Sequence, residues 1–305
     1  MTASAPRSWS WLLGLVPLLG LGELGLHQYF ARRAPGFQDY AALAPQLLKL
    51  KQPGVPVVVT PAWAEPLLRQ AAPSAFPLEE LARADDSSFD GFLEVSLLGQ
   101  TAPELSGFPV ERSWRFGSFA VALRKNPHPM PACFDFVAAV AAGQVEVFSD
   151  RDGEREMCPL AANAHTSTGG LHGHVAYPRQ RFACHHGSFA GVGLIDDQDY
   201  RARRCILVQP PASGRLILRF NGAPLFKKLR GFAGSSYFLE RDRTRAQVEL
   251  GAEQNGRVLG TVRLAGAQGW SPFEWSATDT ADSVELSVRA LAPGPQDFCF
   301  ALEAH

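Results

Sequence analysis

The chain of 305 residues has few charged side chains and no excess of either sign. Charged residues make up 19% of the sequence, below the roughly 25% of an average globular protein. Lys and Arg number 29 against 30 for Asp and Glu, so the formal net charge is -1. Nucleic-acid-binding proteins normally carry a clear basic excess. The composition therefore excludes nucleic acid as the partner.

The motifs of several enzyme classes are also missing. The sequence contains no G-x-S-x-G nucleophile elbow, no phosphate-binding P-loop and no G-x-G-x-x-G after a strand. None of the five cysteines forms a C-x-x-C pair, which excludes a zinc ribbon and a thioredoxin-type redox motif. The acidic residues of segment 150–154 could supply the acid–base pair of a glycosidase, but the segment is more typical of a solvated turn. We therefore expect a non-catalytic protein without a cofactor.

What the chain does contain is turn-forming and apolar residues. It has 28 glycines and 23 prolines, above average usage, which favours many turns and hence β structure. Hydrophobic residues make up 46% of the sequence, enough for a sizeable core. At about 150 residues per domain, the length indicates about two domains.

The most apolar stretch runs from Trp9 to Leu26 and is close to the roughly 20 residues that span a bilayer. Trp9 and Trp11 stand at one end and Tyr29 follows the other, as interface anchors do. We expect residues 1–33 to be an uncleaved signal anchor. A cleaved signal peptide would need an Ala-x-Ala site, which is missing, and a buried helix of a globular domain would need a polar face.

Basic residues do not decide the orientation of this anchor, because the two flanks carry nearly equal positive charge. Arg7 and the chain amine precede the apolar stretch, and Arg32 and Arg33 follow it. The cysteines give a second indication. Cys158 and Cys184 flank a loop rich in Gly and His, whereas Cys205 and Cys299 lie in the first and last strand-like runs of a C-terminal segment.

First and last strands of a sandwich can be neighbours, so we predict the disulfides Cys158–Cys184 and Cys205–Cys299, with Cys133 outside both. Five buried thiols are the alternative. Disulfides indicate an oxidising compartment, which predicts a single-pass protein of the cell membrane with an extracytoplasmic, periplasmic body.

Residues 34–126 predict a small α/β domain. Tyr40, Leu43 and Leu47 recur at helical spacing, and the continuous apolar run 55–61 is typical of a strand buried on both faces. A helix over 62–71 and strands over 92–98 and 115–123 complete this pattern.

Residues 134–305 predict an all-β sandwich that follows a Pro-rich linker. Ten short strand-like runs, the first over 134–140, alternate with turn residues. Asn255-Gly256, between two alternating runs, is a type I′ turn signal. The predicted fold is therefore α+β: an N-terminal membrane helix, a small α/β domain and a jelly-roll-like sandwich.

The candidate metal ligands are weak, and they lie in the loop near Cys184. His172, His174 and His185 are of a type that zinc binds, but their spacing matches no standard zinc module. We interpret the loop as exposed, with a metal site as the alternative.

The last hundred residues carry the candidate ligand-binding residues. Sugars are held by a flat aromatic face together with hydrogen-bonding charged side chains. We therefore predict that Trp270 stacks on a sugar ring and that Arg241 and Asp242 bind hydroxyl groups, with Tyr237 and Arg230 beside them. The alternative places nearby Phe273 and Trp275 in the core and Arg230 on a solvated loop.

Two resemblances extend this interpretation. Segments RCILVQPP, RLILRFNGAPL, VELGAEQNGRVLGTV, GWSPFEWSATDT and VELSVRA resemble a galactose-binding-like jelly-roll module, with its core over about 203–305. Segments VVVTPAWAEPLLRQ and FLEVSL are similar to extracytoplasmic tails of lipid-linked-sugar glycosyltransferases of the protein-mannosyltransferase-like class. Those enzymes have many membrane helices, whereas this chain has one hydrophobic segment. The second resemblance therefore implies an accessory external domain.

The predicted function is non-catalytic recognition of carbohydrate or an envelope glycoconjugate by a membrane-anchored protein of bacterial type. Two alternatives stay open: a glycan-active hydrolase or transferase, and a structural subunit with a membrane-protein partner that covers an apolar patch.

Overall fold

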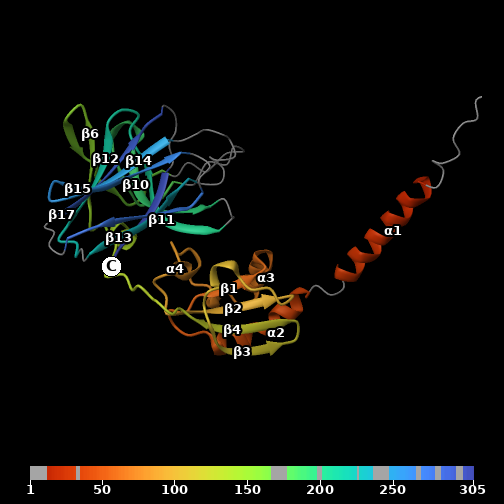
Figure 1. The fold of residues 1–305 in the computed structure, drawn as a ribbon. Coiled ribbons are helices and arrows are strands. Elements are labelled where there is room, and N and C mark those ends of the chain that lie inside the picture. Colours follow the sequence, from red (N-terminus) through yellow and green to blue (C-terminus); the bar gives the residue numbers. More distant parts are fainter. Residues whose placement is uncertain are drawn as a thin grey trace, which may run out of the picture.

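The computed structural model describes residues 12–31, 35–165, 177–197, 201–224, 227–235, 247–265, 269–278, 283–292 and 298–305. In chain order these form helix α1 (Leu12–Ala31), an α/β unit (residues 37–125) and a β-sandwich (residues 134–304). Figure 1 shows the α/β unit lying against one side of the sandwich. The predicted α+β class is confirmed for these two units, while the predicted domain boundaries stay predictions.

Helix α1 covers most of the predicted anchor. Its described leucines are exposed, as Leu18 and Leu24 show, and Pro17 lies within it. Among the residues that the structure describes, no helix is long and apolar enough to cross a membrane. The predicted span begins at Trp9, outside the described residues, so the membrane anchor stays a prediction.

The α/β unit is built around a four-stranded sheet. Its elements, in chain order, are α2 (Phe37–Leu50), β1 (Val57–Thr60), η1 (Ala62–Ala64), α3 (Glu65–Ala71), η2 (Pro73–Ala75), α4 (Leu78–Leu81), β2 (Gly91–Leu97), η3 (Pro103–Leu105), β3 (Val110–Phe116) and β4 (Phe119–Lys125). The sheet order is β1-β2-β4-β3, with β1 parallel to β2 and the other pairs antiparallel. Parallel strands need a long crossover, which the helices between β1 and β2 provide.

Most predicted elements of this unit are confirmed. Helix α2 buries Tyr40, Leu43 and Leu47 against the sheet, and all four residues of β1 are buried. The single strand predicted over 115–123 is wrong, because the chain forms the hairpin β3–β4 there. Gly117, with φ of 58°, makes the turn, and a residue without a Cβ adopts this left-handed backbone at little cost.

The sandwich consists of two sheets. The first has the order β16-β13-β18-β11-β10-β9-β8, with β5 beside β18, and the second has the order β15-β14-β17-β12-β6-β7. The strands of the first sheet are β5 (Phe134–Asp135), β8 (Leu160–Ala161), β9 (Arg181–Ala183), β10 (Phe189–Asp196), β11 (Ala202–Gln209), β13 (Lys228–Gly234), β16 (Ser271–Ser276) and β18 (Phe298–Ala304). Those of the second are β6 (Glu146–Arg151), β7 (Glu154–Met157), β12 (Arg215–Asn221), β14 (Gln247–Gln254), β15 (Arg257–Ala265) and β17 (Ser283–Ala290).

The core of the sandwich lies between these sheets and includes Phe220, Leu218 and Phe300. The strand predicted over 134–140 is wrong after its first two residues, because helix α5 (Phe136–Ala141) begins there. The Asp135 carboxylate accepts hydrogen bonds from the Val137 and Ala138 amides at 2.8 and 3.1 Å. This N-cap starts a helix in a segment whose apolar run is typical of a strand.

Two local predictions about the sandwich are confirmed. Asn255 and Gly256 have φ of 50° and 77° and join β14 to β15, as a type I′ turn does. Both disulfides also form as predicted: Cys158 bonds to Cys184, within the region before β10, and Cys205 on β11 bonds to Cys299 on the neighbouring β18. The remaining cysteine, Cys133, is a thiol whose Sγ donates to the Ala304 carbonyl at 3.0 Å.

Candidate functional site

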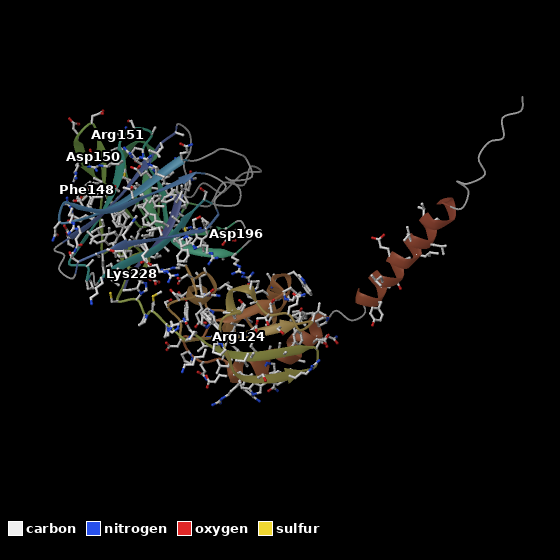
Figure 2. The ribbon with its side chains drawn as sticks, viewed as in Figure 1. Arg124, Phe148, Asp150, Arg151, Asp196 and Lys228 are labelled. Atoms are coloured by element: carbon white, nitrogen blue, oxygen red, sulfur yellow. A yellow bond between two sulfur atoms is a disulfide. The ribbon has the colours of Figure 1, made fainter. Side chains whose placement is uncertain are left out.

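A cleft of about 620 Å³ lies where the α/β unit meets the sandwich. The α/β unit contributes β1, the start of α3, the segment 81–86 and η3 to its lining. The sandwich contributes the end of β10, the start of β11, and the rings of Phe232 and Trp270. Figure 2 shows Asp196, at the end of β10, on the side of the sandwich that faces the α/β unit.

Strand β1 places its edge in this cleft. It is an edge strand of its sheet. The Leu93 amide of β2 donates a hydrogen bond to the Pro56 carbonyl, so this carbonyl points toward β2. Alternate residues of a strand turn their peptide groups to opposite sides, so those of Val57 and Val59 are directed away from β2. Both residues line the cleft, which therefore has backbone donors and acceptors along one wall.

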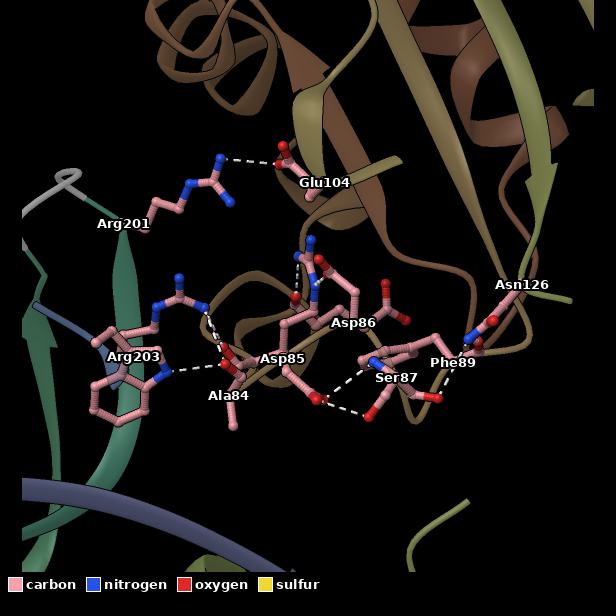
Figure 3. Close-up of polar contacts among 12 residues, drawn as sticks. Ala84, Asp85, Asp86, Ser87, Phe89, Glu104, Asn126, Arg201 and Arg203 are labelled. Carbon is pink, nitrogen blue, oxygen red and sulfur yellow. Dashed lines mark hydrogen bonds and ion pairs between the residues drawn. The ribbon is translucent and has the colours of Figure 1, made fainter. Parts of the chain in front are cut away.

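The segment 82–85 joins the two units by direct hydrogen bonds (Figure 3). The Arg203 guanidinium donates to the carbonyls of Arg83 and Ala84 at 2.9 and 3.2 Å. The Trp270 indole N–H donates to the same Ala84 carbonyl at 3.0 Å. The amide of Arg204 donates to the Ala82 carbonyl at 2.8 Å. We call this set of contacts the seam.

Ion pairs reinforce the seam. Arg203 pairs with the buried carboxylate of Asp197 at 2.8 Å, which fixes the guanidinium that reaches across. Arg230 on β13 pairs with Asp85 of the α/β unit at 3.0 Å. Burial and the neighbouring carboxylates of Asp85 and Asp135 raise the pKa of Glu303 to about 7, against the opposing effect of Arg230.

The predicted ligand-binding residues are only partly brought together. Trp270 and Arg230 both lie at the seam, and Trp270 also lines the cleft. Trp270 is half-buried rather than exposed, since its ring lies nearly parallel to that of Phe232 with 6.2 Å between centroids. Tyr237, Arg241 and Asp242 lie outside the described residues, so their roles stay predictions.

The candidate metal ligands give no site in the described part of the chain. His172 and His174 lie outside it, and Nε2 of His185 is 2.7 Å from a carboxylate oxygen of Glu156. Cys184 is committed to its disulfide. Among the described residues, no group of three His, Cys, Asp or Glu side chains could hold a metal ion.

Trp63 is the residue that the sequence interpretation missed. It stands on η1, just after β1, it lines the cleft, and 57% of its surface is exposed. Beside it Glu65 and Arg69 form an ion pair at 3.4 Å on the first turns of α3. The available signal was its place after a buried strand, because ligands of α/β sheets bind at the carboxyl ends of strands.

Glu104 reaches the cleft from the loop that follows β2, the strand parallel to β1. Its carboxylate pairs at 3.0 Å with Arg201, the residue directly before β11 of the sandwich. Burial alone would lower the pKa of Arg201, but the carboxylates of Glu104, Asp86 and Asp197 raise it above its usual value. The pair therefore places one permanent cation and its counterion in the lining of the cleft.

Comparisons with known proteins identify no family: no family model and no curated protein sequence matches the chain. Several solved structures of carbohydrate-binding modules are similar to it. One is "CBM51 from Clostridium perfringens GH95 in complex with methyl-galactose", at 12% identity and a TM-score of 0.29, covering 46% of this chain and 92% of that one. Another is TmCBM61 in complex with beta-1,4-galactotriose, at 9% identity and a TM-score of 0.23, covering 37% and 77%.

A third similar structure is CBM51-2 with GlcNAc and INT domains from Clostridium perfringens ZmpB, at 10% identity and a TM-score of 0.30. This chain matches 36% of the length of that structure. It matches 26% of a similar structure, the CBM51-2 and INT domains of ZmpB, so it spans well under two thirds of either. At these TM-scores the likeness carries no argument about ligands. None of these comparisons shows the resemblance to glycosyltransferase tails.

Proposed function

We propose that this protein recognises carbohydrate, and that its binding site is the cleft between the α/β unit and the sandwich. The observation that carries the proposal is Trp63, a mostly exposed indole at the wall of a cleft that also holds charged side chains. An indole offers a flat apolar face to the C–H groups of a sugar ring, while nearby charged groups bond its hydroxyls.

The remaining lining suits the same ligand. A volume of about 620 Å³ lies within the roughly 300–1,000 Å³ of small-molecule sites. Apolar surface comes from β1 and Phe232, and hydrogen-bonding groups come from the peptide edge of β1, Arg201 and Glu104. This alternation of apolar and polar surface matches a pyranose better than a purely apolar or strongly charged molecule.

We propose recognition rather than catalysis. Arg69, Arg83, Arg201 and Arg203 at the cleft are each held in an ion pair with a carboxylate. Groups fixed in this way keep their geometry and can still hydrogen-bond a ligand at their open sides.

We extend the proposal to location. Two disulfides are typical of an oxidising compartment, which supports an extracytoplasmic, periplasmic body. The apolar N-terminal stretch, part of which is α1, would tether this body to a membrane. Alkylation of Cys133 in intact cells by a reagent that does not cross the inner membrane is the expected result for a periplasmic body.

A glycan array, followed by titration calorimetry with the full chain, tests the binding proposal. We expect Trp63→Ala to weaken glycan binding by at least about 10-fold, and Trp63→Phe to retain most of it, because stacking on the ring supplies the contact. Phe37→Ala is the matched control, since Phe37 is an exposed aromatic residue outside the cleft. The proposal fails if the unmodified chain binds no glycan, or if Trp63→Ala binds like the control.

A further inference from the structure

The pair Arg201–Glu104 spans the cleft rather than lying along one wall. Glu104 belongs to η3 of the α/β unit, and Arg201 stands directly before β11 of the sandwich. Figure 3 shows the guanidinium extended toward the carboxylate across the space between the two units. Both residues line the same cleft as Trp63.

The Glu104 side of this pair is held by buried contacts. The carboxylate of Glu94, buried on β2, accepts a hydrogen bond from the Ala102 amide at 2.7 Å, directly before η3. The other oxygen of Glu94 pairs with Arg124 at 2.6 Å. These bonds fix where η3 begins, and therefore where Glu104 points.

The Arg201 side is held by its backbone. The Arg201 amide donates to the Asp197 carboxylate at 2.9 Å, and the Asp197 amide donates to the Arg201 carbonyl at 2.9 Å. The Arg201 side chain is 41% exposed, in contrast to the 14% of Arg203 at the seam. Arg201 therefore has a fixed base and an accessible head.

The chemistry of this pair matches two neighbouring hydroxyl groups. A guanidinium has five N–H donors in a planar fork, and the contact with Glu104 occupies only one edge of it. A carboxylate offers only acceptor sites, about four of them. Vicinal hydroxyls each donate and accept, so one can accept from Arg201 while its neighbour donates to Glu104.

The charges around the cleft disfavour an anionic ligand. The four arginines of the lining are paired, and the lining also carries Asp85 and Asp196. A carboxylate or sulfate bound at the open edge of Arg201 would lie in the same cleft as Glu104 and Asp196, and like charges placed side by side are destabilising.

Building on the proposed function, we infer that Arg201 and Glu104 bind a vicinal diol of an uncharged sugar whose ring stacks on Trp63. The ligand then contacts both units at once. Arg201 and Glu104 are specificity-determining residues. Trp63 contributes affinity that depends little on which sugar is bound.

The test compares neutral oligosaccharides with their uronic-acid counterparts on the same glycan array, using the full chain. We expect neutral glycans to bind and the matched uronic acids to bind at least about 10-fold more weakly. Arg201→Gln and Glu104→Gln should each reduce neutral-glycan affinity by about 10- to 100-fold, the range for a lost hydrogen bond to a charged group. Glu285→Gln is the control, because Glu285 pairs with Arg219 on the second sheet, outside the cleft.

Deoxy analogues of the best neutral glycan then separate recognition from general destabilisation. Removing the hydroxyl that donates to Glu104 should weaken binding to the unmodified chain but not to Glu104→Gln, and removing the hydroxyl that accepts from Arg201 should weaken binding to the unmodified chain but not to Arg201→Gln. Preferential binding of uronic acids, or unchanged affinity in both variants while Trp63→Ala loses binding, overturns the inference and leaves carbohydrate recognition standing. Binding of no glycan at all overturns the proposed function as well.

Discussion

The seam and the outer face of the second sheet both carry arginine–carboxylate pairs, yet they differ in burial. At the seam, the side chains of Arg203 and Asp197 are 14% and 3% exposed. On the outer face, Arg263 and Arg289 both pair with Glu249, but they are 70% and 49% exposed. Figure 2 places Phe148 and Asp150, on β6 of the second sheet, far from the α/β unit.

This contrast indicates different roles for similar pairs. Exposed pairs are screened by water and contribute about 0–1 kcal/mol each, and they keep an outward sheet face polar. Loss of one partner of a buried pair leaves an uncompensated charge, which costs about 3–5 kcal/mol. The seam pairs therefore fix how the two units meet, and with that the shape of the cleft.

The largest expected effect is that of Arg203→Ala. This change leaves Asp197 without its cation and removes two hydrogen bonds to the carbonyls of Arg83 and Ala84. We expect a loss of about 3–5 kcal/mol in the free energy of unfolding, measured by urea titration. The unfolding free energy of Arg203→Lys should lie between those of the unmodified chain and Arg203→Ala, because Lys keeps the charge but lacks the fork of donors. A loss under about 1 kcal/mol for Arg203→Ala would abolish the contrast between seam and outer face.

An intermediate effect is expected from pH at the seam, through Glu303. Its carboxyl faces Asp85 of the α/β unit, Asp135, Arg230 and His305, and its pKa is raised from 4.5 to about 7. Between these two pH values the folded chain binds more protons at this residue than the unfolded chain does. Its contribution to stability is therefore fully present below about pH 4.5 and is lost as pH rises through about 7.

Glu303→Gln measures this contribution, because the amide stays neutral at every pH. We expect the variant and the unmodified chain to have similar stability near pH 4.5. Above pH 7.5 the variant should be more stable by about 2 kcal/mol, a figure reduced for partial exposure. The measurement is the melting temperature of both proteins across pH 4.5–8, and parallel curves would contradict the expectation.

The smallest effect is expected from Arg263→Gln on the outer face. Glu249 keeps Arg289 as a partner at 2.6 Å, and the Arg263 head is already in water. We expect a change within about 0.5 kcal/mol in unfolding free energy, smaller still in high salt. Urea titrations at low and high salt would check it. A loss comparable to that of Arg203→Ala would show that exposure does not distinguish the two regions.

Much of the local structure was predictable because it depends on neighbours in sequence. The helical spacing of α2, the continuous burial of β1 and the Asn255-Gly256 turn all follow from residues a few positions apart. The two errors have local causes too. Gly117 makes a tight turn within one apolar run, and Asp135 caps a helix in a segment of mixed propensity.

The residues that line the cleft were harder to predict because they meet only in the folded chain. Trp270 was identified as a candidate, yet its N–H is used by Ala84 of the other unit, a contact between distant segments. Trp63 stands in a stretch whose sequence is typical of the start of an ordinary helix, and its place after a buried strand is a weak signal for its exposure.

The sequence by itself determined the α+β fold class, because periodicity and turn residues act locally, and the positions of the cysteines in the strand-like runs indicated both disulfide pairs. Only the tertiary structure decided which side chains meet at the cleft. Strand β1 ends beside η3 because it runs parallel to β2, and the seam then brings Arg201 opposite Glu104. Long-range packing sets such contacts, and a local pattern does not encode them.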